Sequence, residues 1–161
     1  MATIADLMAL PEASEVLQGL DVSGHIFTEE ELQRLNHREL IDPKFDHAML
    51  TSNPSDLRDV NGQIMARSVV DTRFRGGSLE TMKIRNIVLQ GCLFQVEIID
   101  MTTWENVHMI NCRFRGVFFA ESNSWTLMNS EVRFEGCTFE DCRTSPHSGM
   151  ALLHCLGISV E

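Results

Sequence analysis

An apolar residue stands at every fifth position through the middle of this chain, and this spacing constrains the fold more than any other feature. Fourteen of the sixteen positions in the series are apolar, whereas the 43% apolar content would give about seven. The series is Ile64, Val69, Phe74, Leu79, Ile84, Leu89, Phe94, Ile99, Trp104, Met109, Phe114, Phe119, Ser124, Asn129, Phe134 and Phe139. Strands repeat about every 2 residues and helices about every 3.6, so neither produces this period. The pattern instead indicates a coil built from five-residue sides.

A longer period, equal to four of these sides, is superimposed on the first. The phrase TRFRG at 72–76 returns as CRFRG at 112–116 and as VRFEG at 132–136, and 92–96 reads CLFQV. If four five-residue sides close one coil, each residue lies over the residue one coil later. The sequence therefore predicts one interior column of Phe74, Phe94, Phe114 and Phe134, beside Thr72, Cys92, Cys112 and Val132. The predicted core continues with Leu79, Ile99, Phe119 and Phe139.

The phrases CRFRG, CLFQV, CTFED at 137–141 and GSLET at 77–81 resemble the pentapeptide-repeat family. That family's pattern is a small residue, a polar residue, Leu or Phe, and two more polar residues. The resemblance covers roughly residues 64 to 143. It implies a right-handed quadrilateral β-helix in which the small residue and the Leu or Phe point inward. We therefore expect an all-β solenoid of about four coils with a small α-helical cap at the N-terminus.

The chain of 161 residues is about one domain, which the pattern divides into three parts. We expect a helical N-terminal cap and a leading segment at 1–60, and the pentapeptide-repeat β-helix at 61–145. The remainder, 146–161, is expected to be a C-terminal cap or a dimerisation tail, because MALLHCL is apolar and an end coil must be covered. The family resemblance implies pairing into a homodimer through this tail.

Within the cap, Thr28 and Glu31 form a capping box that predicts a helix start. Further on, Phe45 and Leu50 are one side apart but out of phase with the main series. We therefore expect the segment before residue 61 to hold an incomplete first coil and a loop.

Two positions strain the repeat. Glu97 falls on an inward small-residue position, where burying a bare carboxylate is costly. We therefore expect a local slip that turns Val96 inward. Trp104 is oversized for an inward position, and Ser124, one period later, is expected to give it room.

The stretch 120–131 loses two central apolar residues, so it is predicted to be a loop or a bulge. Trp125 within it has two interpretations. It is an exposed binding anchor, or its side chain folds over the gap left by Ser124 and Asn129.

Signals for catalysis, metals and cofactors are weak. No phosphate-binding glycine loop, nucleophile elbow or HExxH motif is present. Cys137, Cys142 and His147 are each one side apart, which places them on successive sides of a coil rather than around one metal ion. We therefore expect no enzyme activity, no metal and no cofactor. The five cysteines and the lack of a secretory signal fit a reducing cytoplasm, and no apolar run is long enough to span a membrane.

Charge is unevenly distributed along the chain, whose formal net charge is −10. Residues 1–63 carry −8, residues 64–142 carry −2, and the rest is neutral overall. Early in the coil the basic groups dominate, and we expect one face to present Arg73, Arg75, Arg113, Arg115 and Arg133. The late coil is acidic through Glu121, Glu131, Glu135, Glu140 and Asp141.

Two function classes remain. Some pentapeptide-repeat proteins present an acidic rod to DNA topoisomerases, so the resemblance implies an inhibitory or protective binding protein with a DNA-mimicking surface. Its partner would be a DNA-binding protein such as a topoisomerase, a nuclease or a phage-defence complex, without direct contact to nucleic acid or membrane. The acidic contact residues are expected at Glu29, Glu30 and Glu31 and in the late-coil group just named.

The alternative is a scaffold or effector module that offers flat faces to a protein partner without DNA mimicry. The near-neutral coil and its arginines depart from an acidic rod and keep this alternative open. Under it, binding depends on Trp125 or another apolar anchor. Arg73, Arg113 and Arg115 are further candidate partner-binding residues.

Overall fold

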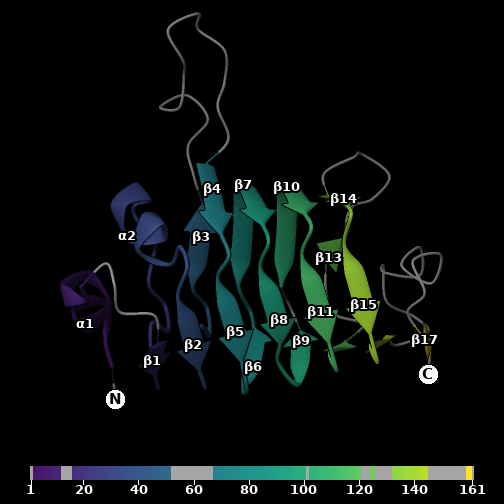
Figure 1. Ribbon diagram of the computed structural model, residues 1–161, viewed down its shortest axis with the longest axis horizontal. Coiled ribbons are helices and arrows are strands. Elements are labelled where there is room, and N and C mark those ends of the chain that lie inside the picture. The colour runs from purple at the N-terminus through teal and green to yellow at the C-terminus, as the bar shows by residue number, and fades with distance from the viewer. Residues whose placement is uncertain are drawn as a thin grey trace, which may run out of the picture.

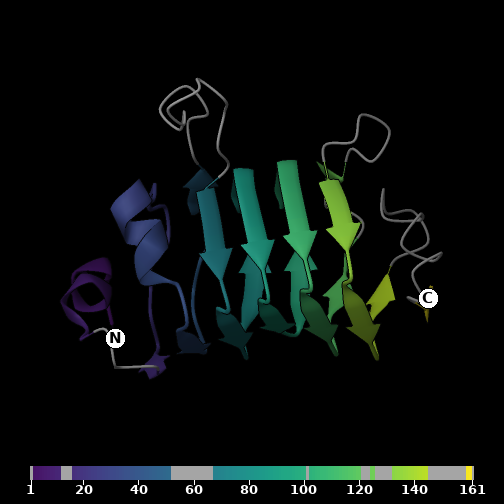
Figure 2. The ribbon, with the colours of Figure 1, turned by 45° about the horizontal axis from the view of Figure 1, so that its top comes forward.

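The computed structural model of the chain describes residues 2–11, 16–51, 67–100, 102–120, 124–125, 132–144 and 159–160. Most of their regular structure is short β-strands, which lie side by side along the long axis of the molecule (Figure 1). The two short helices lie at the N-terminal end of this stack (Figure 2). The fold is therefore an all-β parallel solenoid, as the five-residue period predicted.

Within the described residues the strands form three sheets, and every strand pair is parallel. The first sheet contains β1 (Val16–Gln18), β2 (Glu39–Ile41), β5 (Arg73–Arg75), β8 (Leu93–Gln95), β11 (Arg113–Arg115) and β15 (Thr138–Glu140). The second contains β3 (Met49–Thr51), β7 (Lys83–Gln90), β10 (Thr103–Ile110) and β13 (Ser124–Trp125), with β4 (Arg67–Val70) on β7 and β14 (Val132–Glu135) on β10. The third contains β6 (Ser78–Glu80), β9 (Ile98–Asp100), β12 (Phe118–Phe119), β16 (Arg143–Thr144) and β17 (Ser159–Val160).

The central coils keep the predicted offset of four sides. Phe94 pairs with Phe74 on one side and with Phe114 on the other, at ring-centroid distances of 5.0 Å and 4.8 Å. From Val69 to Phe119, every member of the five-residue series has at most 3% of its surface exposed. The neighbouring column has the same offset and contains Leu79, Ile99 and Phe119. The predicted core is confirmed over this range.

Each side of the coil ends at a corner where the backbone is left-handed. Every fifth residue from 71 to 91 has a φ between 53° and 78°: Asp71, Gly76, Thr81, Asn86 and Gly91. Gly adopts this conformation without strain, and Asp and Asn adopt it more readily than other residues. A Cβ on Gly91 would meet the Asp71 carboxylate, so the glycine leaves room for the corner below it. The corner residues therefore belong to the repeat as much as the apolar positions do.

The predicted slip at Glu97 is confirmed. Val96 stands at a corner position, yet its φ is not positive, because a β-branched residue disfavours the left-handed region. Val96 turns inward and is 2% exposed, whereas Glu97 is exposed. The Glu97 N–H still donates to the Gly77 carbonyl, and the Glu97 carbonyl accepts from the Phe118 N–H. The strand register is thus maintained around the slip.

The predicted offset of four sides is wrong beyond Phe119. Phe114 stacks on Phe139, with ring centroids 4.9 Å apart, so the offset here is five sides. Phe134 pairs with Met109 and Val132 pairs with Val107, so neither belongs to the column of Phe74 and Phe94. Five additional residues lie between 119 and 132: the offset rises from 20 residues at Phe119 to 21 at Trp125 and to 25 at Val132. Because their total equals the length of one side, the apolar period after 132 stays in phase with the period before 119.

The expected pairing of a large with a small residue at Trp104 is also wrong. Thr103 pairs with Ser124, and Trp104 pairs with Trp125, so Ser124 is not in the Trp104 column. Trp104 is nevertheless fully buried. Most of 120–131 and the side chain of Trp125 lie outside the described residues, so both interpretations of Trp125 stay predictions.

Strands also occur before residue 61, where the β-helix was expected to begin. β2 pairs with β5 and β3 pairs with β7, so Leu40 lies under Phe74 and Leu50 under Ile84. β1 pairs with β2, which places Leu17 under Leu40. None of these offsets is a whole number of sides. Phe45, which the sequence placed out of phase, is fully buried in the same core.

The helices are short, and each begins with a capping box. α1 (Ile4–Ala9) is capped by Thr3 and Asp6. α2 (Glu29–Arg34) is capped by Thr28 and Glu31, which confirms the predicted helix start. No helix in the described part of the chain is both long and apolar enough to cross a membrane. Apart from β17, which pairs with β16, the segment 146–161 lies outside the described residues, so dimerisation through it stays a prediction.

Candidate protein-binding faces

The described cysteines form part of the inner wall. Cys92 and Cys112 are fully buried, and the Cys112 thiol lies 3.2 Å from the Leu89 carbonyl that accepts its hydrogen bond. A hydrogen bond with Cys112, together with burial, raises the pKa of Cys137, and burial raises the pKa of Cys142. These two thiols therefore stay protonated near neutral pH, which disfavours thiolate chemistry. Among the described residues, no group of three or more His, Cys, Asp or Glu is arranged to hold a metal ion.

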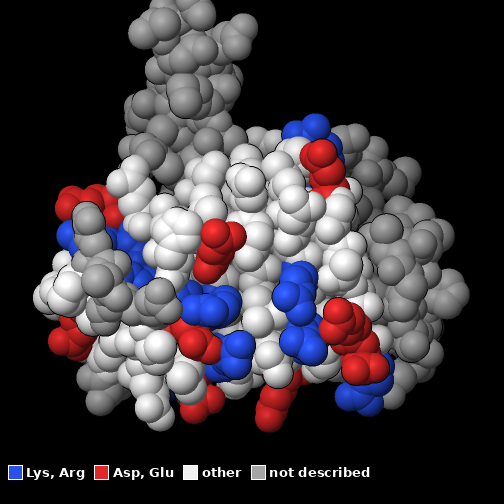
Figure 3. Space-filling view, viewed as in Figure 1, with Lys and Arg blue, Asp and Glu red and all other residues white. Residues whose placement is uncertain are grey.

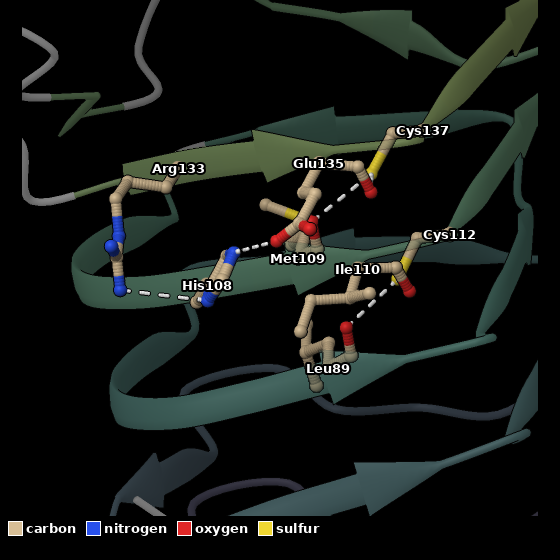
Figure 4. A network of polar contacts seen from close by, with 8 residues as sticks. All are labelled: Leu89, His108, Met109, Ile110, Cys112, Arg133, Glu135 and Cys137. Atoms are coloured by element: carbon tan, nitrogen blue, oxygen red, sulfur yellow. Dashed lines mark hydrogen bonds and ion pairs between the residues drawn. The ribbon is translucent and has the colours of Figure 1, made fainter.

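A polar network joins β14 to β10 in the second sheet (Figure 4). Arg133 Nη2 lies 3.5 Å from His108 Nδ1, and His108 Nε2 lies 3.0 Å from a Glu135 carboxylate oxygen. This geometry suits an imidazole that donates from Nε2 to Glu135 and accepts from Arg133 at Nδ1. Next to it, the Cys137 thiol donates to the Met109 carbonyl at 3.3 Å. The contacts tie the strand that follows the insertion to the regular coils.

The prediction that five arginines share one face is wrong for Arg133. Arg133 lies on β14 in the second sheet, whereas Arg73, Arg75, Arg113 and Arg115 lie on β5 and β11 in the first. The five additional residues before it move Arg133 by one side of the coil, so that it pairs with His108. The four others do share a face, as predicted.

This arginine face is the outer surface of the first sheet, where side chains of both signs are interspersed (Figure 3). Arg75 Nε lies 2.7 Å from Glu39, and Arg115 Nε lies 3.0 Å from Glu140. The intervening strand β8 contributes no charge to the face, because its outward residues are Leu93 and Gln95. The face therefore has a basic centre with a carboxylate at each end.

The predicted N-terminal acids are only partly available to a partner. Glu31 accepts hydrogen bonds from the Thr28 N–H at 2.8 Å and from His25 at 2.9 Å, and its side chain is 13% exposed. Burial acts to raise the pKa of Glu31, but the hydrogen bonds from Thr28 and His25 outweigh it and lower that pKa. Glu30 is exposed, and the side chain of Glu29 lies outside the described residues.

The predicted late-coil acids do not form one surface. Glu135 extends from the second sheet and Glu140 from the first, and both already have cationic or imidazole partners. Asp141 is exposed at the corner that follows β15. Glu121 and Glu131 lie outside the described residues.

The structure contains an acidic column that sequence reasoning missed. Glu80 pairs with Asp100 in the third sheet, and the His47 N–H donates to the Glu80 carbonyl, which places Asp46 in register below Glu80. Each acid directly follows a buried residue of the interior and therefore points outward. Asp46 and Glu80 have no ion pair within the described residues. The offset between Asp46 and Glu80 is longer than four sides and is not a whole number of sides, so the four-side period in the sequence could not reveal this alignment.

Beside the acidic column, the third sheet exposes parts of two apolar side chains. Ile98 and Phe118 are half-buried and paired, and the Arg143 guanidinium lies 5.7 Å from the centre of the Phe118 ring. A shallow hollow of about 370 Å³ lies at the corner formed by Gln95, Val96, Glu97, Arg115, Gly116 and Asp141. The inward turn of Val96 coincides with this hollow.

Comparisons with known proteins found no match: no protein-family model matches the chain, nor does a curated protein or a solved structure.

Proposed function

We propose that this chain is a pentapeptide-repeat protein, a right-handed quadrilateral β-helix of about four coils, that acts as a non-enzymatic inhibitory or protective binding protein. It presents an acidic, DNA-mimicking surface to a DNA-handling protein such as a topoisomerase, a nuclease or a phage-defence complex. The observation that carries the proposal is the outward column of Asp46, Glu80 and Asp100 on the third sheet.

The spacing of charge along the column is comparable to the spacing of phosphate charge along the axis of DNA. Adjacent parallel strands are about 4.8 Å apart, so successive carboxylates are separated by about that distance. One DNA strand carries a charge about every 3.4 Å, which is of the same order. A regular row of negative charge on a flat face is complementary to the Lys and Arg groups that line a DNA-binding groove.

The charge of the whole chain favours the same class of partner. A formal net charge of −10 repels nucleic acid and attracts basic grooves over a distance of about a Debye length. The pairing of Glu31, Glu135 and Glu140 within the protein lowers their contribution to such a contact. The contact is therefore centred on the third sheet, with Asp141, between β15 and β16, at its margin.

The test removes charge from the column without changing shape. A partner captured from a bacterial lysate is assayed for duplex DNA binding in the presence of the wild-type chain and of the triple variant Asp46→Asn, Glu80→Gln, Asp100→Asn. The wild-type chain is expected to compete with DNA, and its binding is expected to weaken steeply with salt. The triple variant is expected to compete at least tenfold less well.

The matched control is the triple variant Asp42→Asn, Glu97→Gln, Glu105→Gln, which removes the same charge from other parts of the surface. It is expected to compete within twofold of the wild type. If both triple variants lose competition equally, net charge rather than the column is responsible. A captured partner whose DNA binding is untouched by saturating wild-type chain would rule out DNA mimicry.

One observation favours the alternative, a protein-interaction scaffold without DNA mimicry. Arg–Glu pairs occupy the outer surface, as at Arg85 and Glu105, which lie 2.9 Å apart, and they leave much of that surface nearly neutral. Binding would then tolerate salt, ignore duplex DNA and depend on an apolar anchor such as Phe118 or Trp125. Phe118→Ala, which removes a half-buried outer ring, is the variant that separates the two functions.

A further inference from the structure

The arginine face is a second charged surface whose sign is opposite to that of the chain. Its basic centre consists of two rows, Arg73 with Arg75 on β5 and Arg113 with Arg115 on β11. Side-chain exposure is 39% at Arg73, 47% at Arg75 and 46% at Arg115, and Arg113 is also exposed. Strand β8 lies between the rows, so they are separated by two strand spacings, roughly 10 Å.

The arginines differ in how the protein's own carboxylates engage them. Glu39 lies 2.7 Å from Arg75 Nε and 4.0 Å from Arg73 Nη2, and Glu140 lies 3.0 Å from Arg115 Nε. Arg113 has no ion pair within the described residues. Arg73 and Arg113 share one column, in which each pairs with Leu93. A partner's carboxylate is therefore expected to bind along this column, and to interact most strongly with Arg113.

The order of charges along the face argues against a second copy of the chain. From β2 to β15 the face reads acidic, basic, neutral, basic, acidic, through Glu39, β5, β8, β11 and Glu140. A two-fold pairing centred on this face would reverse the order and oppose arginine to arginine. The symmetric arrangement is repulsive, so the face is not complementary to itself.

The same order argues against nucleic acid. A phosphate backbone is continuous, whereas the basic centre here is only about two strand spacings long. Glu39 and Glu140 bound it at the two ends and would meet the phosphates that extend beyond it. The net charge of −10 adds a long-range repulsion.

We propose that the arginine face binds an acidic helix of a protein partner, with two carboxylates two turns apart placed over Arg73 and Arg113. Residues i and i+7 of a helix are about 10.5 Å apart on nearly the same side, which matches the separation of the two rows. Arg75 and Arg115, whose ion pairs with Glu39 and Glu140 are shorter than that of Arg73, then border the bound helix. This surface is separate from the acidic column, so the proposal stands or fails independently of DNA mimicry.

The test uses the full chain and two labelled helical peptides of equal charge on an Ala/Gln background. One carries Glu at i and i+7, and the other carries Glu at i and i+2, which point to opposite sides of the helix. Fluorescence anisotropy at low salt is expected to show at least fivefold tighter binding of the first peptide. The variant Arg73→Gln, Arg113→Gln is expected to weaken that binding at least tenfold.

The control variant Lys83→Gln, Arg133→Gln removes the same charge from the second sheet and is expected to change binding less than twofold. Circular dichroism checks that each variant is folded, and Arg113→Gln alone, with at least a threefold loss, replaces the double variant if that does not fold. Equal weakening by both double variants would overturn the proposal. So would equal affinity for the two peptides, no binding to the intact chain, or tighter binding of a single-stranded oligonucleotide to the same arginines.

Discussion

The central coils and the N-terminal strands line the same interior, but the number of residues between paired strands differs in the two regions. Strands between β4 and β12 that pair with one another are four sides apart. Before β4, the steps from Leu17 to Leu40 and from Leu40 to Phe74 differ from each other, and neither is a whole number of sides. Even so, the column of Phe74 continues downward through Leu40 to Leu17.

The difference shows that paired strands keep the same inward and outward alternation while the number of residues in a coil varies. A slip of one residue would turn every inward side chain of a strand outward, so the strands resist it. Additional residues between strands cost only loop entropy, which grows slowly with length. The same rule explains the five additional residues between 119 and 132, after which Phe139 stacks on Phe114.

The largest expected effect comes from breaking the central column. Phe114 is fully buried between Phe94 and Phe139, so Phe114→Asp places an unpaired charge in a stacked aromatic column. We expect a loss of about 5 kcal/mol or more, sufficient to unfold the chain. Arg113→Asp, at the adjacent outward position, is expected to change stability by less than about 1 kcal/mol. Urea unfolding measures both, and equal losses would contradict the assignment of inward and outward positions.

The next prediction, of smaller expected effect, tests whether the N-terminal strands and the central coils unfold together. Phe45 is fully buried and lies 5.8 Å from the Phe74 ring, so Phe45→Ala is expected to cost about 3–5 kcal/mol. The only tryptophans are Trp104 and Trp125, both far along the chain from the substitution. A lower midpoint in their fluorescence would show one cooperative unit. An unchanged midpoint, with a separate early transition in circular dichroism, would mean that residues 16–51 unfold independently.

The smallest effect compares two corners of the regular coils. Gly91 and Gly116 have φ values of 66° and 65°, so Ala at either position costs about 1–2 kcal/mol of backbone strain. At Gly91 the new Cβ also meets the Asp71 carboxylate, whereas at Gly116 it meets nothing within 4 Å. Gly91→Ala is therefore expected to destabilise by about 1 kcal/mol more than Gly116→Ala. In thermal unfolding, the difference in stability between Gly91→Ala and Gly116→Ala should become smaller when Asp71→Gly is added to Gly91→Ala. If that difference persists, the contact with the Asp71 carboxylate is not its cause.

Much of the interior could be predicted, because burial within one side is a local property. The inward residue, its small neighbour and the slip at Val96 depend only on alternation over a few residues. The start of α2 was predictable for the same reason, since a capping box is contained in one short stretch of sequence.

The surface was less predictable, because a face is built from residues of different coils. Arg133 was assigned to the arginine face by counting four sides from Arg113, and the insertion placed it on the second sheet. In the acidic column, the step from Glu80 to Asp100 is four sides, whereas the step from Asp46 to Glu80 is not a whole number of sides. No single period therefore connects its members.

By itself the sequence determined which side chains point inward and that strands would stack in parallel, because a five-residue period of apolar residues admits few other arrangements. Only the tertiary structure decided which residues lie over one another. The pairing of one coil with the next depends on the number of residues in every intervening corner and loop, and additional residues that total five leave the period in phase. The strand pairing of Trp104 with Trp125 and the stacking of Phe114 on Phe139 were decided in this way. These pairings are selected by the packing of complete coils on each other. The free energy of that packing depends on several segments together and cannot be read from any one of them.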